Sequence, residues 1–137
     1  MTSSGAPQPR GSWLRTDREL ENFDLTFRAR TQGRVGTGLF FRSAVEPGKP
    51  ILGWQLDIGA GLDGGLYKEG PKGGLISYPD RAKAIAAAKP GEWNEYRLRA
   101  EGRRLRTWVN GVAMQDHEEK GPRRSRGALA LELSPGS

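Results

Sequence analysis

GEWNEYRLRAEGRRLRTWVNG, residues 91–111, is the stretch that decides the fold. Apolar and polar residues alternate on both sides of the Glu101-Gly102 pair, and this pattern predicts two antiparallel strands joined by a short turn. One face of this hairpin is apolar and must pack against a second layer, because a hairpin alone is only marginally stable in water. The polar outer face carries Arg97, Arg99, Arg106 and Trp108.

The composition of the chain favours a single β-rich domain. Its 137 residues suffice for one two-layer core, and 20 glycines with 9 prolines indicate many turns. We expect residues 1–11 to be disordered and residues 12–137 to form one domain. Without cysteine there can be no disulfides or thiolate metal sites, and no signal peptide or membrane-spanning run is apparent.

The charge balance bears on possible partners. The net charge is +6, from 22 basic and 16 acidic residues. Such an excess favours a solvated basic surface over a specific anionic partner such as nucleic acid. The alternative of nucleic-acid binding rests on the arginines of the hairpin beside Trp108, because aromatic and basic side chains together bind single strands.

Further strands follow from the same alternation. We expect them at residues 13–16, 23–30, 39–43, 52–58, 66–67, 75–76 and 128–133. One short helix is predicted before residues 89–91, with Ser77 as its N-cap, and residues 112–119 are expected to lead into a basic loop at residues 120–126. Trp13, Trp54 and Trp93 are predicted to be core residues. Short strands separated by Gly and Pro turns are typical of an antiparallel two-sheet sandwich.

A polar group on neighbouring strands is the candidate site. Arg42 is out of phase with Leu39 and Phe41, while Gln55 and Asp57 are out of phase with the apolar residues of their own strand. If these strands share a sheet, the three side chains line one surface, where a carboxylate can act as a base and an arginine can hold an anion. The alternative is a plain surface ion pair. From the next segment, Tyr67 and Glu69 could close the same pocket.

Two other signals point to single residues. Trp108 is out of phase with Leu105 and Val109, so it is the aromatic side chain that we expect to stack on a ligand. His117 is the only histidine, so no multi-histidine metal site can form around it. The G-x-G-x-x-G match at residues 59–64 opens no predicted helix and is interpreted as a loop.

Six segments in order resemble one known family, the 3-keto-disaccharide (3-keto-glycoside) hydrolase domain. They are GLFFR (38–42), GWQLDI (53–58), GGLY (64–67), KPGEWN (89–94), RTWVNG (106–111) and GALAL (127–131). The resemblance implies an all-β, concanavalin A-like jelly-roll sandwich with a sugar site on one sheet. It also implies cleavage of a glycoside already oxidised at C3, by removal of the C2 proton, elimination of the C1 substituent and addition of water. Members of this family are commonly exported.

The resemblance also implies roles for single residues. Asp57 or Glu69 would be the base, and either Arg42 or a bound divalent metal would hold the enolate. Gln55, Tyr67, Trp108 and Glu132 would bind the sugar. Where the family often has Gln-x-His, this chain reads Glu132-Leu133-Ser134, and the family's first and last strands have no counterpart. These departures favour, as an alternative, a non-catalytic carbohydrate-binding module.

Overall fold

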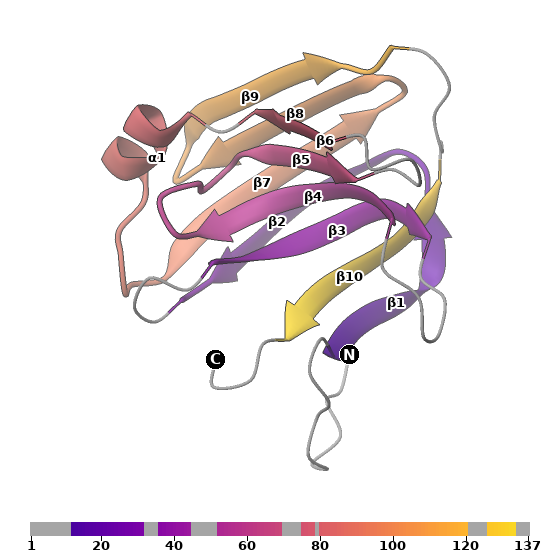
Figure 1. The fold of residues 1–137 in the computed structure, drawn as a ribbon, viewed down its shortest axis with the longest axis horizontal. Coiled ribbons are helices and arrows are strands. Elements are labelled where there is room, and N and C mark those ends of the chain that lie inside the picture. The colour runs from indigo at the N-terminus through magenta and orange to yellow at the C-terminus, as the bar shows by residue number, and fades with distance from the viewer. Residues whose placement is uncertain are drawn as a thin grey trace.

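Two antiparallel sheets pack face to face in the computed structural model, and the one with six strands lies in front of the other in Figure 1. The structure describes residues 12–31, 36–44, 52–69, 75–78, 80–120 and 126–133, with the backbone alone described at 12–17, 52, 69, 75–78, 132 and 133. The six-stranded sheet has the order β1 (Ser12–Leu20), β10 (Gly127–Leu133), β3 (Gly36–Ala44), β4 (Leu52–Gly59), β5 (Leu66–Glu69) and β6 (Leu75–Tyr78). The four-stranded sheet has the order β2 (Phe23–Ala29), β7 (Asn94–Glu101), β8 (Arg104–Val109) and β9 (Val112–Glu118).

The predicted hairpin is confirmed as β7 and β8, and it forms the centre of the four-stranded sheet. Its alternating apolar residues are fully buried, as the period of two requires. They face the inward residues of the six-stranded sheet across a single core, whose main members are Leu39, Phe41, Trp54, Leu56, Ile58, Leu66, Tyr96, Leu98, Leu105 and Val109. The core therefore fixes which side chains of β4 point outwards.

Three local predictions were wrong. Residues 112–118 form β9 rather than the start of a loop, because pairing with β8 completes the sheet edge. The helix α1 (Arg81–Ala87) has Asp80 as its N-cap, since that carboxylate accepts a hydrogen bond from the Lys83 amide, whereas Ser77 lies in β6. Trp93 is 63% exposed rather than in the core. No helix among the described residues is long and apolar enough to cross a membrane.

A β-bulge interrupts β3 and redirects one side chain. Phe41 pairs with Trp54 and Ala44 pairs with Leu52, so β3 has one more residue than β4 over this interval. At the bulge Arg42 has a φ of 48°, in the left-handed region that side chains other than glycine seldom adopt. The alternation of β3 is broken at this point, and Arg42 is only 1% exposed.

Candidate functional site

The outer face of the six-stranded sheet brings together three of the predicted residues. Gln55 and Asp57 point outwards from β4 because the residues between and beside them belong to the core. Gln55 lies directly opposite Tyr67 of β5 on one side and Phe40 of β3 on the other. Its amide covers Gly38, where an added Cβ would lie 2.0 Å from Gln55 Nε2. Gly38 therefore leaves room for the Gln55 side chain beside Asp57.

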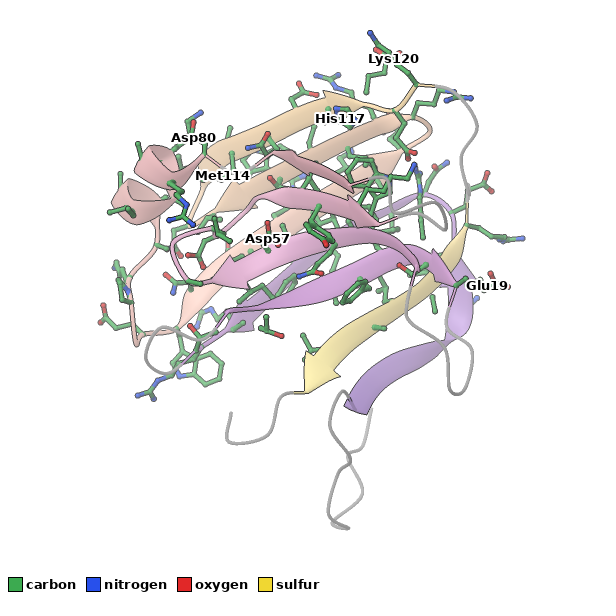
Figure 2. The ribbon with its side chains drawn as sticks, in the orientation of Figure 1. Glu19, Asp57, Asp80, Met114, His117 and Lys120 are labelled. Atoms are coloured by element: carbon green, nitrogen blue, oxygen red, sulfur yellow. The ribbon has the colours of Figure 1, made fainter. Side chains whose placement is uncertain are left out.

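Asp57 is a titratable group on this face, in β4 (Figure 2). Asp57 is only 8% exposed, and Gln55 Nε2 lies 3.5 Å from Asp57 Oδ1. Burial, with a smaller contribution from the negative charge of Asp63, raises the pKa of Asp57 from 3.8 to about 7. A carboxyl group with this pKa exchanges its proton near neutral pH, which is the property of a general base.

The turn after β4 holds Asp57 through its backbone. The Asp57 amide donates to the Gly65 carbonyl at 2.8 Å, and the Asp57 carbonyl accepts from the Gly64 amide at 2.9 Å. Two buried side chains of the other sheet anchor this turn. Thr107 Oγ1 donates to the Gly64 carbonyl at 2.6 Å, and the Tyr96 hydroxyl donates to Asp63 Oδ1 at 2.5 Å. The four-stranded sheet thus positions a residue of the six-stranded one.

Asp63 was missed by the sequence analysis, which interpreted residues 59–64 only as a loop. It is 5% exposed, and its Oδ1 also accepts a 2.7 Å hydrogen bond from the Gly59 amide. An acidic residue between glycines is common in turns, so the sequence carries no signal that distinguishes it. Burial of the Tyr96 hydroxyl, its hydrogen bond to Asp63 and the negative charge of Asp63 together raise the pKa of Tyr96.

Replacing Tyr96 by phenylalanine tests this anchor. The variant Tyr96→Phe removes the hydroxyl that donates to a buried carboxylate, so we expect the free energy of unfolding to fall by about 1–3 kcal/mol. Urea denaturation of both proteins at pH 7 measures the difference. Since the aromatic ring stays in place against Phe27, the loss reports on the hydroxyl and not on packing. An unchanged free energy of unfolding would show that Asp63 does not need this donor.

The predicted convergence of Arg42 with Gln55 and Asp57 is wrong. The bulge in β3 turns the Arg42 guanidinium into the space between the sheets, where it bonds to Glu119 Oε1 at 3.2 Å. It also donates to the Glu21 carbonyl at 2.9 Å and to the Gly102 carbonyl at 2.6 Å. Arg42 is therefore part of a buried network that ties the sheets together, and it is not available to hold an enolate on the outer face.

Trp108 lies on the outer face of the opposite sheet, so it does not share a surface with Gln55 and Tyr67. The Arg97 guanidinium stacks over its ring at 4.6 Å from the centroid. The arginines around it form ion pairs across the sheet surface, Arg97 with Asp24, Arg99 with Glu101 and Arg104 with Asp116. These carboxylates neutralise much of the positive charge on which the alternative of nucleic-acid binding rests.

Two predicted residues are placed by their backbone alone. Glu69 pairs with Gly53 and Glu132 pairs with Trp13, and the side chains of both glutamates lie outside the described part of the structure. Within the described residues, no three His, Asp or Glu side chains are grouped so that they could hold a metal ion. We therefore assign no catalytic step to the divalent metal that the family resemblance allowed.

Several solved structures of other proteins are similar to this fold. The carbohydrate-binding module CBM66 from Bacillus subtilis is 16% identical, with a TM-score of 0.67 over 93% of this chain and 76% of that one. A glycosyl hydrolase candidate from Parabacteroides distasonis is also 16% identical, with a TM-score of 0.69 over 93% of this chain and 77% of that one. Sheep galectin-11 is 12% identical, with a TM-score of 0.56 over 91% of each chain. These likenesses confirm the expected jelly-roll sandwich.

Sequence comparison settles the family. Among curated proteins, no relative matches this chain. The family of 3-keto-alpha-glucoside-1,2-lyase-like domains matches over residues 1–137, which is the whole length and includes all six segments that carried the resemblance. The protein therefore belongs to the 3-keto-alpha-glucoside-1,2-lyase-like domain family.

Proposed function

We propose that the outer face of β3, β4 and β5 binds a 3-keto-glucoside and that Asp57 removes its C2 proton. The observation that carries this proposal is a carboxylate only 8% exposed, with the Gln55 amide beside it and Tyr67 facing that amide across the strand pair. A poorly hydrated carboxylate beside polar side chains suits proton abstraction next to a ketone. The family to which the chain belongs supports the choice of substrate.

The proposed reaction starts at the C2–H bond. The C3 ketone makes that proton acidic, so the Asp57 carboxylate takes it and the bonding electrons pass into an enolate with its charge on the C3 oxygen. Collapse of the enolate expels the C1 substituent with its electron pair and leaves a double bond between C1 and C2. The aglycone takes up a proton, and water then adds to the unsaturated ketone. Overall, the glycosidic bond is hydrolysed, with no oxidant or reductant consumed.

Gln55 and Tyr67 are the proposed binding residues. Both can donate hydrogen bonds to oxygen atoms of a sugar ring lying across β4 and β5, since they face each other in register. A hydrogen-bond donor next to the C3 oxygen stabilises the negative charge as it develops in the transition state. The Gln55 amide is the described group best placed for this task, because it already lies 3.5 Å from Asp57 Oδ1.

The pH dependence of the reaction is a direct test of this base. The pKa of Asp57 is about 7, and a base acts only when it is deprotonated. We therefore expect kcat/KM for release of a chromogenic aglycone from a 3-keto-α-glucoside to rise tenfold per pH unit below pH 7 and to level off above it. A substrate with deuterium at C2 should react more slowly. A flat profile between pH 5 and 8, or equal rates for both isotopes, would contradict proton abstraction by Asp57.

A non-catalytic sugar-binding module is the second candidate function. The likeness to CBM66, which covers 93% of this chain, supports it, and so does the withdrawal of Arg42 from the outer face. Calorimetry separates the two functions. A module of this kind would bind glucosides with measurable heat and leave a 3-keto-glucoside intact after prolonged incubation, with or without added Mg²⁺ or Ca²⁺. Release of the aglycone under the same conditions would eliminate this candidate.

A further inference from the structure

A cavity of about 270 Å³ opens at one end of the sandwich, between the turn after β4 and the helix α1. Figure 1 shows α1 at the end where β4 finishes. This cavity is separate from the outer face that carries Gln55 and Tyr67, since neither residue lines it. The residues that line it are Thr31, Gly59, Ala60, Gly61, Asp63 and Ala84, with Ile85, Ala88, Pro90 and Asn94.

Asp63 is the charged group of the cavity. The residue is 5% exposed, and both hydrogen bonds that it accepts, from the Gly59 amide and the Tyr96 hydroxyl, reach Oδ1. None of the described residues donates a hydrogen bond to Oδ2. A carboxylate oxygen can accept more than one hydrogen bond, and Oδ2 is not one of the fully buried polar atoms that lack a partner, so it can take donors from a ligand in the cavity.

The opposite wall is apolar and comes mainly from α1. Ala84 is fully buried. Ile85, the largest aliphatic side chain of α1, is 69% exposed. Ala88 and Pro90 continue this wall. A cavity with an apolar wall facing one well-placed polar group has the usual form of a small-molecule site, and its volume lies just below the range of about 300–1,000 Å³ for drug-sized ligands.

We propose that this cavity is a second binding site, for a compact neutral polyol about the size of one monosaccharide. Such a ligand places adjacent hydroxyl groups against Asp63 Oδ2 and an apolar C–H face against Ala84 and Ile85. An anionic ligand is disfavoured by the Asp63 charge, and an ammonium ion by the positive charges of α1 and its continuation, Arg81, Lys83 and Lys89. The site does not depend on the reaction proposed for Asp57.

Backbone NMR of the full chain tests this site. We titrate ¹⁵N-labelled protein separately with D-glucose, D-galactose, D-mannose and methylammonium. For at least one sugar we expect saturating shifts of amides in residues 81–88 and 59–61, with a Kd on the order of millimolar for so small a ligand. The exposed variant Ile85→Asp, which adds a charge to the apolar wall, should weaken binding about tenfold. The matched variant Val112→Asp changes an exposed apolar residue outside the cavity and should bind like the wild type.

Each other outcome counts against the proposal. Shifts confined to residues around Gln55 and Tyr67, with none in residues 81–88, would support the outer-face site and overturn this one. Absence of shifts with all three sugars would overturn it as well. If methylammonium alone moved these amides, the ligand class would be wrong. Equal weakening by Ile85→Asp and Val112→Asp would show that binding does not depend on the apolar wall.

Discussion

Replacing Asp57 by asparagine is expected to lower kcat for aglycone release from a 3-keto-α-glucoside by about 10²–10⁴-fold, the usual contribution of a general base. Asparagine keeps the shape of the side chain and the neighbouring Gln55 contact but cannot take up a proton. Binding of the sugar should change little, because the proposed binding residues Gln55 and Tyr67 remain. Steady-state kinetics at pH 8, where the wild-type carboxyl group is mostly ionised, measure the loss.

Two controls separate this loss from misfolding. The folded-state pKa of Asp57, about 7, lies above its ordinary value of 3.8, so the stability that the protonated group contributes is lost as the pH rises through 7. The variant Asp57→Asn has no carboxyl group that ionises at this position, so its stability does not fall in this way. It should be at least as stable as the wild type at pH 8. The matched variant Asp116→Asn changes an exposed carboxylate of the other sheet and should keep full activity. Full activity of Asp57→Asn would exclude Asp57 as the base.

Replacing Glu119 by glutamine is expected to lower the free energy of unfolding by about 3 kcal/mol, because it removes the negative charge that pairs with the buried Arg42 guanidinium. The side chains of Arg42 and Glu119 are 0% and 2% exposed, so water cannot compensate for the missing charge. Glu119 also lies 3.5 Å from Lys68 Nζ, which stacks over the Trp54 ring. Urea denaturation monitored by tryptophan fluorescence measures the loss, which is a large fraction of the stability of a typical domain.

The control is a pair of the same kind on the surface. Glu101→Gln breaks the exposed contact with Arg99, and such pairs contribute at most about 1 kcal/mol. In a double variant, Arg42→Met with Glu119→Gln, the buried charge is absent, so the combined loss should be smaller than the sum of the two single losses. Additive losses, or equal effects at Glu101 and Glu119, would contradict a buried ion pair between the sheets.

The alternation of apolar and polar residues was enough to predict the layers of this protein. Leu98 and Leu105 lie in the core and Arg97 and Arg106 face outwards, as the period of two requires. The same rule placed Gln55 and Asp57 correctly on the outer face. It failed for Val112–Glu118, whose polar residues resemble a loop, because the pairing with β8 that makes this segment a strand is not visible in its own composition.

The sequence by itself determined the two-sheet sandwich, the family and the outward direction of Gln55, Asp57 and Tyr67, because side-chain alternation is a local property of an extended chain. Only the tertiary structure decided where the Arg42 side chain lies. One extra residue in β3 relative to β4 reverses the direction of this side chain, and Glu119, to which it bonds, is 77 residues away in the sequence. It also decided the proton affinity of Asp57, which depends on burial and on the charge of Asp63. Hydration and long-range contacts are set by how the sheets meet, and no single stretch of sequence specifies that.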